Sequence, residues 1–393
     1  MEVLILSEIP VWNISKGSGI RVISETIHGF NLHGWKTELI CPGIANMPAP
    51  PNAKILAIKL LGAIYMFLWR KGFVKRSEIM LDKLFKIKQF KMIYAIGPTS
   101  HFIANKLKCR HPFVIVVARY LGTWSMYSKM NNKFYQLKKT YIINNYTLPA
   151  DLYVLTDDGT RALDVFTRFG VNSNKILFIK NGVDIDSFTN AEADRTIVTK
   201  QNIHEEDFLI LIVTRLAKGK NVEQVIKSIR KFLVNHCSSL IIIGDGPERK
   251  RIERLVRHYK LNEKVKILGA LPHSELAKYY KIADIVISAY NYSNAGNPLL
   301  EAIASGTCVI AFNNGDTKKF LPDSYDLLID DMNFQMIAEY LNELYFNRER
   351  LKRNKKLIEE HAKELLVNWD DRIEREIVEI EKTISNIREL DKT

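Results

Sequence analysis

The second half of the chain alternates short apolar runs with stretches of helical periodicity, and this alternation limits the possible folds more than any other feature of the sequence. The runs are short and rich in Ile, Leu and Val, as expected of strands buried on both faces. A strand, a helix and another strand in succession form a parallel pair with a crossover connection. We therefore predict a parallel sheet covered by helices on both faces. Its strands are expected at 208–214, 239–243, 265–268, 284–288 and 307–312.

The first half shows the same rhythm less regularly. A buried-strand run opens the chain, and a helical stretch ends near His33. The alternation again favours a doubly wound parallel sheet. Its strands are expected at 3–6, 37–41, 92–96, 113–118 and 152–155.

A chain of 393 residues is long enough for two domains of roughly 150–200 residues each. The stretch 184–205 is polar and precedes the restart of the alternation, so it marks the junction. A helical pattern from Trp369 to about Leu390 follows the second domain. We predict domains at 1–190 and 191–368, and a C-terminal helix, 369–393, that packs on the first domain.

The net charge of +13 belongs entirely to the first half. Residues 1–190 carry 25 Lys and Arg against 12 Asp and Glu, whereas residues 191–393 carry 32 of each kind. A basic surface suits either nucleic acid or an anionic membrane. Because no pattern of a nucleic-acid-binding module is present, we expect no nucleic-acid partner and favour an anionic membrane surface.

The segment 54–91 contains ten of these basic residues and only two acids, Glu78 and Asp82. Its apolar part, 55–69 (ILAIKLLGAIYMFLW), is too short to span a bilayer, which needs about 20 residues. Basic residues interspersed with Leu, Ile, Phe and Trp are typical of a helix that lies in a membrane interface. A core helix with a solvated basic flank explains the composition equally well.

The four cysteines are far apart, form no CxxC pair, and each lies in or beside an apolar run. This pattern favours buried, reduced thiols over disulfides or a metal site. The opening MEVLILSEIP enters a strand-like run without a basic leader, so we expect no signal peptide. With the basic segment, this predicts a cytoplasmic protein, peripheral on the inner face of the cell membrane. The cysteines are Cys41, Cys109, Cys237 and Cys308.

Chemically useful residues follow several strands of the second half. Arg215 and Lys220 come after the first strand, and glycine turns follow the next two. After the fourth strand, YSNAGNPLLEAIASG (292–306) opens a helix with Pro298 and carries Glu301 in its first turn. Parallel strands bring these residues to one edge of the sheet, where α/β proteins bind ligands. Long cations and a helix N-terminus suit a diphosphate, and a carboxylate there suits the hydroxyls of a ribose.

The second half resembles the donor domain of the retaining glycosyltransferases of family 4. The matching stretches are VTRLAKGKNVEQVI, IIIGDGPERKRIE, VKILGALPHSELAKYYKIADIVISAY and GNPLLEAIASGTCVIA. The end of the first domain, DLYVLTDDGTRALDVFTRFGVNSNKILFIKNGVDIDSF, also matches, so the resemblance covers roughly 150–330, and the first 45 residues more loosely. It implies the GT-B architecture, in which two Rossmann-like domains with doubly wound parallel sheets face a cleft.

The resemblance also implies roles for individual residues. Arg215 and Lys220 would bind the diphosphate of a UDP- or GDP-linked sugar and stabilise charge on the leaving group, which makes a metal or other cofactor unnecessary. Glu301 would bind the ribose. The other expected donor contacts are the N–H groups of Leu299 and Leu300 at the phosphate, the backbone near Leu268 at the base, and the glycine loop of Gly17 and Gly19 from across the cleft.

The chain departs from the family pattern at two places. The family has a Glu, seven residues and a second Glu; here the second is Glu301, but Ser293 stands at the first position, which usually contacts the transferred sugar. Asn294 or Asn297 could supply amide contacts instead. Many relatives also have a His after the strand that here reads VIVVARYLGTW, where Arg119 becomes a candidate contact of the sugar or the acceptor.

The resemblance therefore implies a retaining glycosyltransferase that moves a sugar from a nucleoside-diphosphate donor to an acceptor. With the basic segment, a lipid-linked or cell-surface glycan at the membrane is the expected acceptor. The alternative is a degenerate glycosyltransferase that serves as a non-catalytic, membrane-bound scaffold or regulator. Ser293 favours this alternative, whereas Arg215, Lys220 and Glu301 argue against it.

Overall fold

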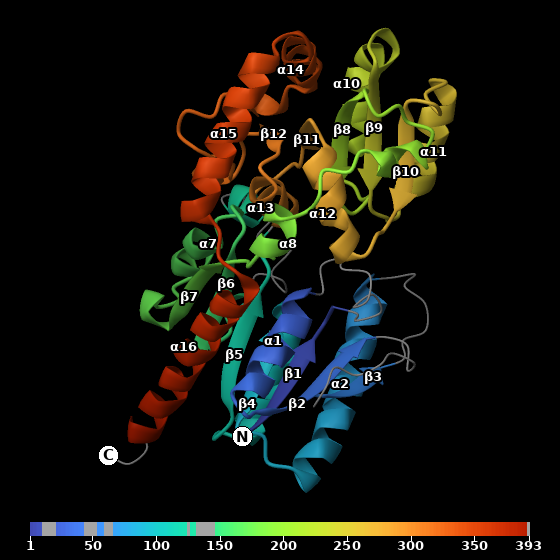
Figure 1. Cartoon of the computed structure of the whole chain (residues 1–393). Coiled ribbons are helices and arrows are strands. Elements are labelled where there is room, and N and C mark those ends of the chain that lie inside the picture. Colours follow the sequence, from blue (N-terminus) through green and yellow to red (C-terminus); the bar gives the residue numbers. More distant parts are fainter. Residues whose placement is uncertain (10–20, 43–52, 59–65, 124–125, 131–145, 391–393) are drawn as a thin grey trace.

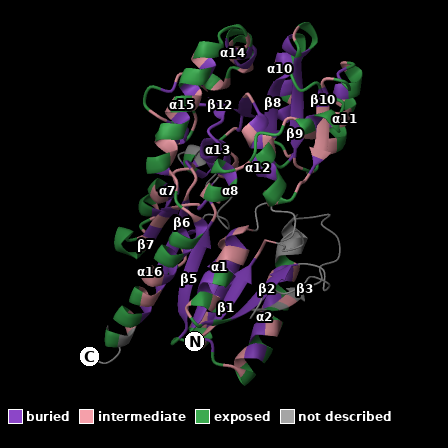
Figure 2. Ribbon diagram, viewed as in Figure 1, coloured by how far each residue is buried: buried purple, intermediate pink, exposed green. Residues whose placement is uncertain are grey.

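The computed structural model describes residues 1–9, 21–42, 53–58, 66–123, 126–130 and 146–390. Two lobes, each built around a parallel sheet, lie one above the other, and the last helix runs back along the first lobe (Figure 1). The strands of both sheets are largely buried, and the exposed residues lie mainly on helices and loops (Figure 2). The predicted two-sheet α/β architecture is confirmed.

The first sheet has seven parallel strands in the order β3-β2-β1-β4-β5-β6-β7. Helices α1 and α16 cover one face, and α2, α3 and α7 cover the other. The strands are β1 Glu2–Ser7, β2 Lys36–Pro42, β3 Ala53–Ile58, β4 Met92–Ile96, β5 Ile115–Tyr120, β6 Leu152–Asp157 and β7 Ile176–Lys180. The helices are α1 Arg21–Leu32, α2 Met66–Ile87, α3 Pro98–Arg110, α4 Met126–Lys129, α7 Ala162–Arg168 and α16 Trp369–Leu390.

The second sheet has six strands in the order β10-β9-β8-β11-β12-β13, and one continuous apolar core surrounds it. The strands are β8 Phe208–Val213, β9 Ser238–Ile243, β10 Val265–Gly269, β11 Ile285–Ser288, β12 Cys308–Phe312 and β13 Leu328–Ile329. The helices are α10 Val222–Asn235, α11 Arg249–His258, α12 His273–Ile282, α13 Asn297–Ala304, α14 Phe334–Phe346 and α15 Arg348–Leu365. Short helices α8 Ile185–Thr189 and α9 Thr196–Thr199 lie in the connection between the sheets.

All ten predicted strands are present, but β3, β7 and β13 were missed. The error at β3 matters most, because the apolar start of the basic segment was interpreted as helix. Residues 53–58 instead pair in parallel with β2, and the helix begins only at Met66. Periodicity alone does not separate a short buried strand from a short buried helix.

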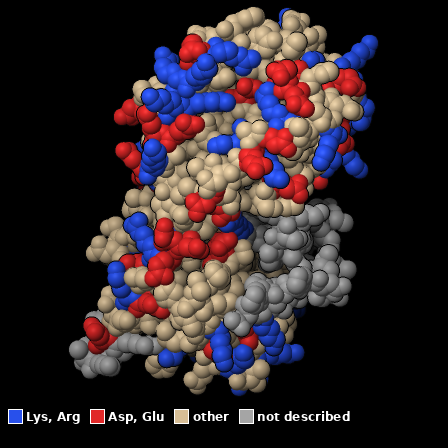
Figure 3. All heavy atoms as spheres, viewed as in Figure 1, with Lys and Arg blue, Asp and Glu red and all other residues tan. Residues whose placement is uncertain are grey.

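Helix α2 belongs to the core of the first lobe. Phe73, Leu81 and Leu84 on it are buried among residues of the sheet and of α3. The opposite side of the helix exposes Lys and Arg together with Ile79 and Ile87. A space-filling view shows basic side chains gathered over the lower end of this helix (Figure 3). The core-helix interpretation with a solvated basic flank therefore describes α2. None of the helices that the structure describes is long and apolar enough to cross a membrane.

The chain passes between the lobes twice, and the two passages lie side by side. Val183 N–H donates to Val367 O at 2.9 Å, and Ile185 N–H donates to Asn368 Oδ1 at 3.2 Å. A Cβ at Gly182 would lie 2.6 Å from Trp369 Cα, so only glycine permits this close approach of the two backbones.

Helix α16 then completes the core of the first lobe. Ile377 and Ile380 are fully buried, and they pack with residues of α1 and of strands β1 and β4. A Cβ at Gly29 on α1 would overlap with Ile373, so the two helices approach very closely. Residues from the far end of the chain thus cover one face of the first sheet.

The cysteines are free, as expected, but only Cys41 and Cys308 are buried. The expected burial is wrong for Cys109 and Cys237, which are exposed. Cys109 lies in the last turn of α3, and Cys237 lies just before β9, so both fall where elements end at the surface.

We predict that Ile377→Ala lowers the free energy of unfolding by about 2–5 kcal/mol, since it leaves a cavity in a packed core. Urea unfolding followed by circular dichroism measures this change. Arg375→Ala, at an exposed position of the same helix, is the matched control and should change stability by less than about 0.5 kcal/mol. Equal effects of the two substitutions would contradict the placement of α16 in the core.

Candidate active site

Three loops at the carboxyl ends of β8, β9 and β10 are bound to one another through their backbones. Leu216 N–H donates to Asp245 O at 3.0 Å, and Gly244 N–H donates to Gly269 O at 2.7 Å. Gly244 and Gly246 have positive φ, and a Cβ on either would overlap with a carbonyl of residue 214 or 216. The glycine turns therefore let the loop after β9 support the loop that carries the predicted cations.

Lys220 lies at the end of that supported loop, with its ammonium 3.4 Å from the centre of the Tyr290 ring. Among the described residues it has no ion-pair partner. Burial lowers the pKa of Lys220 to about 8, although Asp158 acts in the opposite direction. A cation held over an aromatic face in a poorly hydrated place favours the approach of an anion.

Arg215 precedes Lys220 on the same loop, and its side chain is exposed. No hydrogen-bond or ion-pair partner of this guanidinium lies within the described parts of the chain. The structure therefore brings two cations without counter-ions to the carboxyl edge of the second sheet, as the sequence indicated. Their binding of a diphosphate stays a prediction.

Helix α13 begins at the same edge, but its free donors are not the predicted ones. Leu299 N–H donates to Gly296 O at 2.9 Å, and Leu300 N–H donates to the same oxygen at 3.3 Å. The expectation that these two groups are free is therefore wrong. The N–H groups of Gly296 and Asn297, one turn earlier, have no hydrogen-bond partner among the described residues. They are the donors that α13 offers to an anion.

The asparagines near the start of α13 have structural partners. Asn294 is fully buried, its Oδ1 accepts from Ser288 Oγ and Tyr290 N–H, and its amide donates to the carbonyl of Phe312. This side chain shapes the loop and has no freedom to contact a sugar. Asn297 accepts a hydrogen bond of 2.8 Å from Asn181 Nδ2, which ties α13 to the turn after β7.

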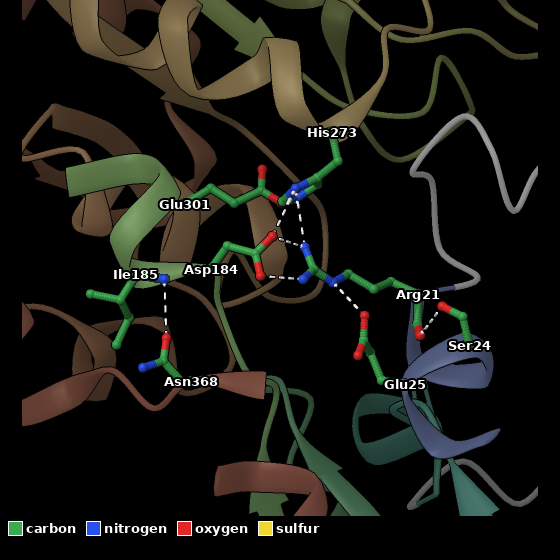
Figure 4. A network of polar contacts seen from close by, with 8 residues as sticks. All are labelled: Arg21, Ser24, Glu25, Asp184, Ile185, His273, Glu301 and Asn368. Atoms are coloured by element: carbon green, nitrogen blue, oxygen red, sulfur yellow. Dashed lines mark hydrogen bonds and ion pairs between the residues drawn. The ribbon is translucent and has the colours of Figure 1, made fainter. Parts of the chain in front are cut away.

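Glu301 lies in a network of charged groups that joins the two lobes (Figure 4). Its Oε1 lies 3.0 Å from His273 Nε2, and its Oε2 accepts from the Tyr280 hydroxyl at 3.0 Å. A carboxylate has about four acceptor positions, so each oxygen of Glu301 retains capacity for one more donor. The predicted ribose contact is compatible with this arrangement and stays a prediction.

The network continues from His273 to Asp184 and then to Arg21 at the start of α1. His273 Nδ1 lies 3.4 Å from Asp184 Oδ2, and the Arg21 guanidinium donates to both oxygens of Asp184. Arg21 also pairs with Glu25 at 3.1 Å. Arg21 Nη1 also lies 3.1 Å from His273 Nδ1, so only the ring of His273 separates the carboxylate expected to bind the donor from an arginine of the other lobe.

These contacts shift the pKa values along the network. Burial alone would lower the pKa of His273, but hydrogen bonds to Asp184 and Glu301 raise it to about 9. Burial alone would raise the pKa of Asp184, but His273 and Arg21 hold it well below its usual range. The Arg21 guanidinium, 3.1 Å from Nδ1, acts to lower this pKa, but the ring of His273 stays protonated at neutral pH between the carboxylates of Glu301 and Asp184.

Sequence reasoning missed His273 and Arg21 as members of the site. His273 lies within the quoted family stretch, directly after Pro272 at the start of a helix, so a signal for a site residue was available. Arg21 had none, because its partners are distant in the sequence.

The structure places the remaining predicted residues as follows. Leu268 lies where the register between β10 and β9 shifts, and such an irregularity frees backbone groups from the ladder. Ser293 faces the first lobe, with its hydroxyl donating to Asp158 O at 2.6 Å. Gly17 and Gly19 lie outside the described residues.

Arg119 does not reach the cleft. It is fully buried on the face of the first sheet under α16, beside Tyr94, Arg372 and Glu376. None of its guanidinium nitrogens has a hydrogen-bond partner among the described residues. The prediction that Arg119 contacts the sugar or the acceptor is wrong for this arrangement, since alternate residues of a strand face opposite sides and Arg119 shares the side of the buried Val117.

The described residues contain no group of three or more His, Cys, Asp or Glu side chains that could hold a metal ion. A reaction without metal stays a prediction.

Solved structures share this two-lobed fold. Sucrose-phosphate synthase from Thermosynechococcus elongatus superposes with a TM-score of 0.78 at 18% identity, covering 98% of this chain and 100% of that one. The Anabaena protein HepE in complex with UDP-glucose gives a TM-score of 0.74 at 15% identity, with the same coverage. The chain therefore has the GT-B fold of glycosyltransferases.

Comparisons of the amino-acid sequence find relatives of higher identity. Residues 194–364 match the model of the family described as glycosyl transferases group 1. An uncharacterized glycosyltransferase of Methanocaldococcus jannaschii is 28% identical over 300 residues, which are 73% of this chain and 74% of that protein. The alpha-monoglucosyldiacylglycerol synthase of Streptococcus pneumoniae is 24% identical over 261 residues, 64% of this chain and 57% of that protein. The second lobe therefore matches the group 1 glycosyl transferases, and these comparisons identify the protein as a glycosyltransferase.

We predict that His273 makes the stability of the protein depend on pH. Its pKa is higher in the folded chain than its ordinary value of 6.5, so its contribution is complete below pH 6.5 and is lost as the pH rises through about 9. The loss should reach about 1–3 kcal/mol. Thermal unfolding between pH 6 and 10 measures it as the difference between wild type and His273→Gln.

The exposed His204 offers the matched control, and His204→Gln should follow the wild-type profile. A His273→Gln profile parallel to wild type over the whole range would contradict the proposed protonation.

Proposed function

We propose that the protein is a retaining glycosyltransferase that moves a sugar from a nucleoside-diphosphate donor to a lipid-linked or cell-surface glycan acceptor at a membrane. The observation that carries the donor part is the pair of cations at the carboxyl edge of the second sheet, Arg215 and Lys220, which have no counter-ion among the residues that the structure describes. The free N–H groups of Gly296 and Asn297 start α13 at the same edge. Together they suit the two phosphates of such a donor.

The chemistry follows from where charge develops. When the bond between the sugar and the diphosphate breaks, negative charge grows on the leaving phosphate oxygen. Lys220 and Arg215 neutralise this charge, and because Lys220 is poorly hydrated before the reaction, it needs little reorganisation to do so. Binding of the anion would also raise the pKa of Lys220 and keep it protonated. With such a clamp a divalent metal is not required. An acceptor that attacks from the side of the leaving group gives retention without an enzymic nucleophile.

The donor base and ribose are assigned to the region of Leu268 and Glu301. The irregular pairing at Leu268 offers backbone groups to a base, and Glu301 offers two partly used oxygens to the ribose hydroxyls. HepE, whose fold this chain shares, was crystallised with UDP-glucose, which supports a UDP-linked donor; a GDP-linked donor fits the same contacts.

Two observations support an acceptor at a membrane. The relative from Streptococcus pneumoniae is named for a diacylglycerol glycolipid, and its match of 261 residues is too long for 191–393 alone, so it extends into the first half. The exposed side of α2 carries Lys71, Lys75, Arg76 and Lys83 near the apolar Ile79. Such a surface attracts anionic lipid headgroups at about 1 kcal/mol per cation. We propose a peripheral position on the inner, cytoplasmic face of the cell membrane.

The non-catalytic alternative, a membrane-bound scaffold or regulator, rests on Ser293 in place of the family's first acid. Arg215 and Lys220 favour the enzyme, because a scaffold has no need for two cations at the edge of a sheet that form no ion pair with any described residue.

We predict that Lys220→Ala and Arg215→Ala each lower kcat about 10²–10³-fold, as expected for the loss of one donor to a developing anion. The assay is release of nucleoside diphosphate from a panel of UDP- and GDP-sugars, with lipid extract as the acceptor source. Lys218→Ala removes an exposed cation from the same loop and is the matched control, with activity within about twofold of wild type.

The panel separates the two functions. Wild type that turns over no donor, with or without lipid extract, would favour the scaffold. Turnover that Lys220→Ala and Arg215→Ala leave unchanged would refute the assignment of the donor site.

We predict that replacing Lys75, Arg76 and Lys83 by Gln weakens binding to anionic vesicles by at least 10-fold. Flotation with phosphatidylglycerol-containing liposomes measures this. Phe73 is buried, so it is left unchanged to keep the core intact. The matched control replaces three exposed cations of α11 by Gln, namely Lys250, Arg254 and Arg257. Equal flotation of both variants would show that α2 is not the membrane surface.

A further inference from the structure

Asp158 is a half-buried acid at the junction of the lobes that the donor contacts described above do not use. It follows β6 directly, at the carboxyl edge of the first sheet. Its backbone oxygen accepts the hydroxyl of Ser293 from the second lobe at 2.6 Å. The residue thus lies next to the position where the family pattern has its first acid.

The side chain of Asp158 is held in place by two loops of the first lobe. Its Oδ1 accepts from Thr160 N–H at 3.1 Å and from Thr160 Oγ1 at 2.6 Å. Thr160 Oγ1 in turn accepts from Thr123 N–H at 2.9 Å, in the loop after β5. A Cβ at Gly122 would overlap with Asp158 Oδ2, so the glycine makes room for this oxygen. Locked side chains of this kind are typical of residues that contact a ligand.

The charge of this carboxyl acts on the proposed donor site. Asp158 has no ion-pair partner among the described residues, yet it lies close enough to Lys220 to raise the pKa of that ammonium against the effect of burial. Burial raises the pKa of Asp158 itself to about 6. An acid without a partner in such a place favours hydrogen-bond donors. The sugar of a donor is bonded to the phosphate next to Lys220, so its hydroxyls must lie in this neighbourhood.

Ser293 leaves no room for a longer side chain in its present direction. A Cβ at Gly159 would overlap with Ser293 Oγ, and a Cβ at Gly315 would lie 3.2 Å from Ser293 Cβ. A glutamate at this position would meet the backbone of 158–159 instead of a sugar. The loops of both lobes therefore accommodate a small residue at position 293. The acid at this contact is Asp158 of the first lobe and not residue 293 of the second.

We propose that Asp158, from the first lobe, accepts hydrogen bonds from hydroxyls of the transferred sugar and determines which sugar the enzyme accepts, in place of the acid that Ser293 replaces. The inference rests on the proposed donor site at Lys220. A carboxylate accepts at both oxygens, and Oδ2 is the one that the turn with Thr160 leaves available for vicinal hydroxyls. Since Asp158 and Lys220 come from different lobes, the sugar would be recognised only when the lobes are together.

The competing explanation is that Asp158 only closes the turn with Thr160, as Asx side chains often do. Asp158→Asn separates the two roles, because the amide oxygen still accepts from Thr160 while the acceptor at Oδ2 becomes a donor. The matched control is Asp157→Asn, which changes the neighbouring, half-buried acid.

Two measurements are made on each full-length variant. Calorimetry gives the Kd of the nucleoside diphosphate, and kcat/KM is compared for donor pairs that share a base and differ at one sugar hydroxyl, such as UDP-glucose and UDP-galactose. We expect Asp158→Asn to keep the nucleotide Kd within about twofold while kcat/KM for the preferred donor falls about 10–100-fold and the preference between the pair collapses. Asp157→Asn should match wild type in both.

The outcomes are distinct. Wild type that binds no nucleoside diphosphate refutes the proposed function. Wild type that binds and turns over, with donor preference unchanged in Asp158→Asn, refutes only the role of Asp158. Loss of nucleotide affinity in parallel with kcat/KM also refutes it, because the defect is then not specific to the sugar. If Asp158→Asn unfolds, Thr160→Val, which removes the hydroxyl donor to Oδ1 but keeps the backbone donor and the charge, must still change the donor preference.

Discussion

The two adjacent passages of the chain between the lobes are the constraint on which the rest of the structure depends. The hydrogen bond between Val183 and Val367 and the close approach of Gly182 to Trp369 bind the outgoing and returning strands of the connection to each other. Two parallel connections fix the lobes more firmly than one, and they turn the carboxyl edges of both sheets toward the same space. Every contact between Asp158 and Ser293, or between Arg21 and His273, follows from this arrangement.

Electrostatics then divides the space between the lobes into two parts with different character. On the side of Lys220 and Arg215, the cations have no ion-pair partner within the described part of the chain, which leaves them available to an anion. On the side of Glu301, each charge has an opposite charge beside it, through His273 and Asp184 to Arg21. A glycosyltransferase needs both kinds of site, one with unpaired cations and one with paired charges. Unpaired cations provide the stabilisation of a leaving diphosphate, and paired groups hold a hydroxyl-binding carboxylate in a fixed position without the cost of an isolated buried charge.

The sequence predicted those parts of this arrangement that depend on local pattern. Ten strands, the supported loop with Lys220 and the start of α13 all follow from alternation and turn residues. The free N–H groups of α13 were predicted one turn too late in the sequence. The N–H groups of Leu299 and Leu300 are not free, because both donate to the Gly296 carbonyl. The two-residue period of a strand puts Arg119 on the same face as the buried Val117, whereas the resemblance to the family implied a position in the cleft. The pairing of Arg21 with Asp184 spans 163 positions, and no local sequence pattern predicts a contact between residues so far apart.

The packing of α16 against Gly29 and the first sheet has a consequence for synthesis. The strands of the first lobe leave the ribosome long before residues 369–390, which cover one of its faces. Translation at about 5–20 residues per second separates β7 from α16 by roughly 10–40 s. During that interval the apolar surface that α16 later covers is exposed. We expect the nascent chain to be most prone to self-association, and most dependent on chaperones, at this stage.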